Sequence, residues 1–170
     1  MTVISIHTTF AFRAHYHQKV CEGGFFVNET IQLLQDVVRN ARTGQDSVEH
    51  LMKKVDDQRM RDELIREKED YAVTRRESER ALENAGGSAE PVGPLAKAGM
   101  WVGLEMETLA DRSDAHIAEI VIQGATMGVI EMTKALNTYD GADSDARSLA
   151  SKFVVQQSET IDRQKGFLQN

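Results

Sequence analysis

Three side chains have the types and spacing that suit metal binding. His116 and Glu119 are three residues apart, so a helix would place both on one face, with Gln123 one turn later. Glu67 lies in the middle of an earlier helical segment, at a position expected to face inward. Imidazole and carboxylate groups suit iron and other divalent metals. One hypothesis is therefore a metal site formed by Glu67, His116 and Glu119.

The same residues have two simpler interpretations. Glu67 and Glu119, together with the inward polar residues Tyr71 and Gln156, would form a hydrogen-bonded layer that fixes the register of the helices. Alternatively, His116 lies so close to the start of its helix that it faces water. Burying an unpaired carboxylate costs several kcal/mol, so a buried Glu119 would need a partner. The sequence leaves these alternatives open.

Composition limits the other classes of function. The chain has 20 basic and 27 acidic residues and a formal net charge of -7, so nucleic acid is not an expected partner. No uninterrupted apolar stretch approaches the roughly 18 residues that cross a bilayer, so no membrane span is expected. Cys21 is the single cysteine, which excludes an internal disulfide and suggests a cytoplasmic location. A glycine-rich phosphate loop after a strand is also absent, which disfavours an ordinary kinase.

The candidate site needs helices to position it, and the hydrophobic pattern predicts four long ones. The first two cover 28–55 and 57–85, with an N-cap at Asp56 between them. The third and fourth cover 113–139 and 143–170, and each starts at a capping Ser or Asp. Only 2 prolines and 6% aromatic residues fit this pattern, so the predicted class is all-α.

The predicted helices differ in how they face the core. On 57–85 the inward line contains Met60, Leu64, Glu67, Tyr71, Thr74, Ser78 and Leu82, and on the last helix it contains Leu149, Phe153, Gln156, Thr160, Gln164 and Phe167. The helix over 113–139 is apolar nearly all the way round at its centre, which predicts that other helices enclose it. Gly124 and Gly128 on that helix are expected to allow close helix packing.

The connections decide the topology. Those after the first and third helices are too short for anything but antiparallel hairpins. The link over 86–112 is long enough to travel the length of the bundle, and it contains a predicted short helix from Pro94 to Leu109. A four-helix bundle with one such crossover is the ferritin-like topology, and simple up-and-down order is the alternative.

Residues 1–26 differ from the rest of the chain. They hold three of the five histidines and the only cysteine, without helical periodicity. Glu22-Gly23-Gly24 can be encoded by a purine run of the kind that bacterial ribosomes bind, and Val27 by the start codon GTG. We therefore predict a four-helix-bundle domain over 27–170 with translation starting at Val27. A targeting peptide and a disordered arm are the alternatives for 1–26.

The segment KAGMWVGLEMETLADRSDAHIAEIVIQGATMGVIEMTKALN, residues 97–137, carries a family resemblance. Together with the order of the elements, it resembles a group of uncharacterised bacterial ferritin-like four-helix-bundle proteins, found mostly in anaerobic Gram-positive bacteria. The resemblance covers the chain from Val27 onward. It implies a fold but no activity, cofactor or site residues. The Glu-x-x-His pairs of di-iron ferritin-like proteins are absent, because neither His50 nor His116 has a glutamate three residues before it.

These observations favour a non-catalytic interaction or structural protein without a cofactor, which associates with itself as a homo-oligomer or with a protein partner. The alternative is a metal-binding or redox protein that holds iron or another divalent metal in the polar layer between the second and third long helices. A small-molecule binder with a cavity beside the helix over 113–139 is a third possibility.

Overall fold

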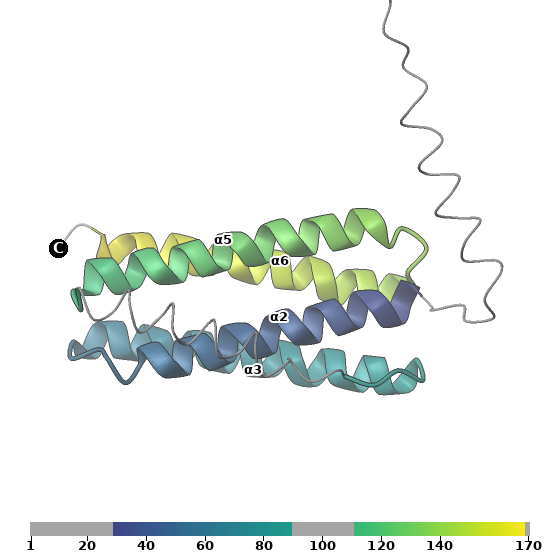
Figure 1. Ribbon diagram of the computed structural model, residues 1–170, viewed down its shortest axis with the longest axis horizontal. Coiled ribbons are helices and arrows are strands. Elements are labelled where there is room, and N and C mark those ends of the chain that lie inside the picture. Colours follow the sequence, from purple (N-terminus) through teal and green to yellow (C-terminus); the bar gives the residue numbers. More distant parts are fainter. Residues whose placement is uncertain (1–28, 90–110, 169–170) are drawn as a thin grey trace, which may run out of the picture.

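The computed structural model describes residues 29–89 and 111–168, and these residues form an all-α four-helix bundle (Figure 1). The long helices are α2 (Glu29–Leu51), α3 (Gln58–Asn84), α5 (Asp114–Thr138) and α6 (Ser144–Gln164), and a short 3-10 helix, η1 (Lys165–Phe167), follows α6. The predicted all-α class is confirmed. The predicted arm over 1–26 and the predicted helix from Pro94 to Leu109 lie outside the described residues.

Short polar residues begin three of the helices. The Asp57 side chain accepts a hydrogen bond from the backbone N–H of Met60 at 2.9 Å, and the predicted caps at Ser113 and Asp143 make the same type of bond. The predicted cap at Asp56 is wrong by one residue. Asp57 takes this role because α3 begins at Gln58, and its carboxylate then reaches the third N–H of the helix.

Glycine ends α3. Gly86 has a φ of 79°, a left-handed conformation that glycine adopts without steric cost. The N–H of Gly87 then donates to the carbonyl of Leu82, and the N–H of Gly86 donates to the carbonyl of Glu83. These two bonds form a Schellman motif, which satisfies carbonyls that would otherwise lack partners. The predicted end of this helix at residue 85 agrees with the structure, in which α3 ends at Asn84 and Ala85 is its C-cap.

The helices form two antiparallel hairpins, α2 with α3 and α5 with α6 (Figure 1). Hydrogen bonds join the start of α2 to the turn between α5 and α6, from the N–H of Gly141 to Glu29 and from that of Asp143 to Thr30. Gln35 of α2 also bonds to Ser88, just beyond the end of α3. Thus α3 and α5 end at the same end of the bundle, and α5 begins at the other. Helices α3 and α5 therefore run in the same direction, as expected if the link between them travels the length of the bundle. Residues 90–110 of that link lie outside the described residues.

The inward line predicted for α3 is confirmed at all of its positions, because these residues are the buried ones of that helix: Met60, Leu64, Glu67, Tyr71, Thr74, Ser78 and Leu82. The line predicted for the last helix is correct at Phe153, Thr160, Gln164 and Phe167. It is wrong at Gln156 and Leu149, which are only half-buried, whereas Gln157 and Ala150 are buried. Helix α6 is rotated so that Gln157, rather than Gln156, faces Tyr71.

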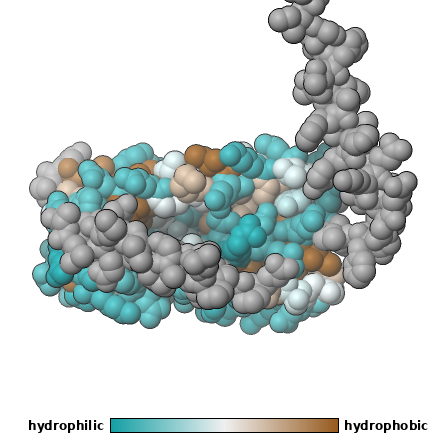
Figure 2. All heavy atoms as spheres, viewed as in Figure 1, coloured by the Kyte–Doolittle hydropathy of each residue, from teal (hydrophilic) through white to brown (hydrophobic). Residues whose placement is uncertain are grey.

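The prediction that other helices enclose α5 is wrong for the described residues. Helix α5 packs mainly on α6 and α2, and its buried residues face them. On the other side, the Met127 and Ile130 side chains are 55% and 41% exposed. The face shown in Figure 2 is mainly hydrophilic, with hydrophobic residues in separate groups. Within the described ranges, none of the helices combines the length and the apolar character needed to cross a bilayer.

Candidate ligand site between α2 and α5

The structure places Glu67 in the core between α3 and α6. Glu67 is 1% exposed, and its Oε1 accepts a hydrogen bond of 2.7 Å from Nε2 of Gln164. Its Oε2 has no hydrogen-bond partner among the described residues. Burial raises the pKa of Glu67 to about 7, although the bond from Gln164 and the charge of Arg163 oppose the rise. A buried carboxyl with this pKa changes protonation near neutral pH.

His116 and Glu119 lie elsewhere, on the first turns of α5. Nδ1 of His116 is 3.4 Å from Oε2 of Glu119, and the Glu119 side chain is 58% exposed. The two are therefore paired with each other, and Glu67 is not part of their cluster. Across residues 29–89 and 111–168, no three His, Cys, Asp or Glu side chains gather closely enough to hold a metal ion.

The buried layer around Glu67 is made mainly of amides and hydroxyls. The hydroxyl of Tyr71 donates to Oε1 of Gln157 at 2.6 Å, and the hydroxyl of Thr74 donates to Oε1 of Gln156 at the same distance. Burial raises the pKa of Tyr71, so its phenol keeps the proton that it donates. One carboxylate with neutral amides and hydroxyls does not match the carboxylate and imidazole set that a di-iron centre uses.

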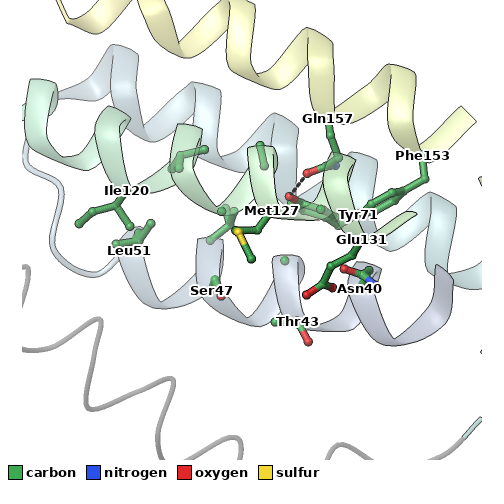
Figure 3. A pocket seen from close by; sticks show the side chains of 16 residues that line it. Asn40, Thr43, Ser47, Leu51, Tyr71, Ile120, Met127, Glu131, Phe153 and Gln157 are labelled. Carbon is green, nitrogen blue, oxygen red and sulfur yellow. Dashed lines mark hydrogen bonds between the residues drawn. The ribbon is translucent and has the colours of Figure 1, made fainter. Parts of the chain in front are cut away.

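A groove lies between α2 and α5, and Tyr71 and Gln157 of this layer form part of its lining (Figure 3). Its volume is about 270 Å³, slightly below the range of about 300–1,000 Å³ that is usual for small-molecule sites. Helices α2 and α5 form its walls, and one residue of α3 and two of α6 reach its floor. The lining residues are Asn40, Thr43, Gly44, Ser47, Val48, Leu51, Tyr71, Ile120, Val121, Gly124, Ala125, Met127, Gly128, Glu131, Phe153 and Gln157.

Three glycines shape the groove in different ways. At Gly44 a β-carbon would lie 2.4 Å from two ring atoms of Tyr71, so only glycine lets that ring lie against α2. At Gly128 a β-carbon would meet Phe153 at 3.4 Å, which agrees with the predicted role in close packing. At Gly124 a β-carbon would meet no atom of the described residues within 4 Å, so the packing role predicted for this residue is not seen among them. Within the described part of the chain, Gly124 leaves open space in the wall of the groove.

The floor of the groove contains a buried donor without an acceptor. Gln157 is 1% exposed, and its Oε1 is already bonded to Tyr71, as the dashed line in Figure 3 shows. Its Nε2 has no hydrogen-bond partner among the described residues. A buried amide N–H without an acceptor costs about 1–3 kcal/mol. This nitrogen has almost no accessible surface, so an acceptor in the groove would reach it only after a small shift of the surrounding side chains, and would then remove that cost.

The groove lining determines what chemistry it can support. Asn40, Thr43, Ser47 and Glu131 provide polar groups, and most of the other lining residues are apolar or glycine. The described lining contains no His, Cys, Lys or Arg. The described lining therefore lacks imidazole and thiol groups, but Ser47, Thr43 and Glu131 provide hydroxyl and carboxylate groups. This lining suits a ligand that is mainly apolar and has a few polar groups.

Comparison with known proteins gives the fold. No family model matches the sequence, and no curated protein is similar to it in sequence. The crystal structure of a DUF305 fragment from Deinococcus radiodurans has a similar structure, with a TM-score of 0.65 and 16% sequence identity. The match covers 82% of this chain and 95% of the fragment. At this identity the similarity shows the fold alone.

This match confirms only part of the family resemblance predicted from the sequence. The chain has the all-α four-helix fold of an uncharacterised domain, but a relationship to ferritin-like proteins remains a prediction. The sequence did not predict a groove between the first and third long helices. Its only sequence signals were the glycines of the third long helix and the possibility of a cavity beside that helix.

Proposed function

We propose that the protein is a non-catalytic binding protein that holds a small, mainly apolar ligand in the groove between α2 and α5. The observation that carries this proposal is the composition of the groove, which combines an apolar lining with a few polar groups. Ligand sites generally have this composition. The proposal develops the third possibility that the sequence left open, a small-molecule binder with a cavity beside the helix over 113–139, because it gives the ligand a position and a class.

Helix α5 offers a direct test of the proposal. The substitution Gly124→Leu places a side chain in the groove, where its β-carbon meets no atom of the described residues within 4 Å. Leucine also favours the helix by nearly 1 kcal/mol relative to glycine, so the variant should fold. Indane, a small bicyclic hydrocarbon, is a suitable probe, and its binding can be measured by chemical-shift titration.

We expect indane to bind the unmodified protein saturably and to lose at least tenfold in affinity for Gly124→Leu. Thr133→Leu is the matched control, because residue 133 is exposed on the same helix and does not line the groove. The control should bind indane as the unmodified protein does. Failure of indane to bind, or equal binding by Gly124→Leu, would rule out the groove as a site for apolar ligands.

The metal-binding or redox alternative keeps Glu67, His116 and Glu119 as its candidate ligands. The positions of these residues do not favour it, because the half-buried His116 pairs with the exposed Glu119, apart from the buried Glu67. Metal analysis of protein purified without a chelating tag tests this alternative. Stoichiometric iron, manganese or zinc that is lost in both Glu67→Ala and Glu119→Ala would support it.

Self-association and a cytoplasmic location remain predictions. The exposed apolar side chains of Met127 and Ile130 on α5 support self-association, because such groups are suited to a contact between copies of the chain. Light scattering coupled to size-exclusion chromatography tests it. If these residues form the contact, Ile130→Lys should shift the protein toward the monomer.

A further inference from the structure

We infer that the ligand is a neutral molecule with an apolar body and a hydrogen-bond acceptor, such as a carbonyl oxygen, that binds Nε2 of Gln157. This inference rests on the proposed function, because it assigns a ligand class to the same groove. It adds the position of the polar group within the site and the charge that the ligand carries.

The position of the acceptor follows from the hydrogen bonds at the floor. Oε1 of Gln157 accepts from Tyr71, which leaves the two Nε2 hydrogens as the donors of this amide. Gln157 is buried against α5, where a β-carbon at Gly128 would lie 3.5 Å from its Cγ. The amide therefore has little room to turn toward solvent. A ligand acceptor at the floor would complete its hydrogen bonding.

The charge of the ligand follows from the groove lining. The described lining residues include no cationic side chain, so nothing in the groove would compensate a buried carboxylate or phosphate. Glu131, the one acidic side chain in that lining, is exposed. It adds an unfavourable interaction for an anion. The acceptor is accordingly a neutral oxygen or nitrogen atom.

The experiment compares 1-indanone, which has one carbonyl acceptor, with indane, which has nearly the same shape and none. We expect the unmodified protein to bind the ketone about 5- to 10-fold more tightly, the size expected for one buried hydrogen bond. Indane-1-carboxylate provides the test of charge. It should bind at least tenfold more weakly than the ketone at pH 8, where its carboxylate is ionised.

Two variants assign the preference to Gln157. In Tyr71→Phe/Gln157→Leu both hydrogen-bonding partners become apolar, a change that can be nearly neutral for stability. The double variant should bind indane and 1-indanone with equal affinity. Tyr71→Phe alone retains Nε2 of Gln157 and should therefore retain the preference for the ketone. This single variant controls for the loss of the phenol.

The outcomes separate the ligand class from the proposed function. If indane binds and Gly124→Leu weakens it, but the ketone has no advantage in the unmodified protein, the ligand class is wrong and the groove remains a binding site. The ligand class is also wrong if the double variant still prefers the ketone, or if the carboxylate binds as tightly as the ketone. If neither neutral probe binds, the proposed function is wrong as well.

Discussion

Gly44 of α2 lies directly against the ring of Tyr71 on α3, where a β-carbon would approach Cε1 and Cζ to 2.4 Å. This contact lets the phenol cross beneath α2 and reach Gln157 on α6. A glycine on one helix thus sets the position of a hydrogen bond between two others. The same contact places the Tyr71 ring in the groove, where it forms part of the lining.

The first prediction concerns this contact. Gly44→Ala should destabilise the protein by about 1–2 kcal/mol, because the cost of overpacking exceeds the gain of about 1 kcal/mol in helix propensity. Gly124→Ala is the matched control and should stabilise the protein by about 0.5–1 kcal/mol, since its β-carbon meets none of the described residues. Urea denaturation measures both. Equal stability of the two variants would show that the Tyr71 ring does not lie against Gly44.

The second prediction concerns the pH dependence caused by Glu67. Its pKa is about 7 in the folded protein against a reference value of 4.5, so the folded state holds a proton that the unfolded state loses first. The contribution of Glu67 to the free energy of unfolding therefore falls as the pH rises from 4.5 to 7, and is constant above that range. The total change is about 3 kcal/mol.

Glu67→Gln removes this titration and should be more stable than the unmodified protein at pH 8, with a smaller difference at pH 5. Chemical denaturation at several pH values measures the difference. Glu83→Gln is the control, because Glu83 is exposed on the same helix. If the stability difference between Glu67→Gln and the unmodified protein did not change with pH, an ionisable, buried Glu67 would be excluded.

The third prediction concerns the bond between Tyr71 and Gln157. Tyr71→Phe leaves both polar atoms of the buried Gln157 amide without partners, and should cost about 1–2 kcal/mol of stability. Adding Gln157→Leu removes the orphaned amide and should recover much of this loss. A double-mutant cycle by urea denaturation measures the coupling. Purely additive effects would show that the bond contributes nothing.

The fourth prediction concerns the start of α3. Asp57→Ala should cost about 1 kcal/mol, because the N–H of Met60 loses its capping acceptor. Asp56→Ala, one residue earlier, should have a much smaller effect. Thermal or chemical denaturation of the two variants decides which aspartate caps the helix. A larger loss for Asp56→Ala would favour the cap that was predicted from the sequence.

The sequence predicted the inward line of α3 because its buried residues repeat at three- and four-residue steps, from Met60 to Leu82. The same approach failed at the centre of α6, where Gln156 and Gln157 are adjacent and identical in type. Whether Gln156 or Gln157 faces inward depends on how α6 is rotated about its axis. The hydrogen bond between Tyr71 and Gln157 determines that rotation. That contact joins residues 86 positions apart, so local periodicity carries no information about it.

The candidate site was harder to predict than the fold. His116 and Glu119 were correctly placed on one helical face, but whether this face meets the core or water depends on the neighbouring helices. A groove is the space that several helices leave unfilled, so it has no sequence pattern of its own. Gly124 was ambiguous for the same reason, since a helical glycine accompanies either close packing or open space.

The most direct test of the account is to locate a bound ligand by intermolecular NOEs between 1-indanone and the isotope-labelled protein. We predict contacts from the ligand ring to Ala125 and Phe153, and a contact from a ligand proton next to the carbonyl to the side-chain amide protons of Gln157. Saturable binding with contacts elsewhere on the protein, or no saturable binding at all, would contradict the account.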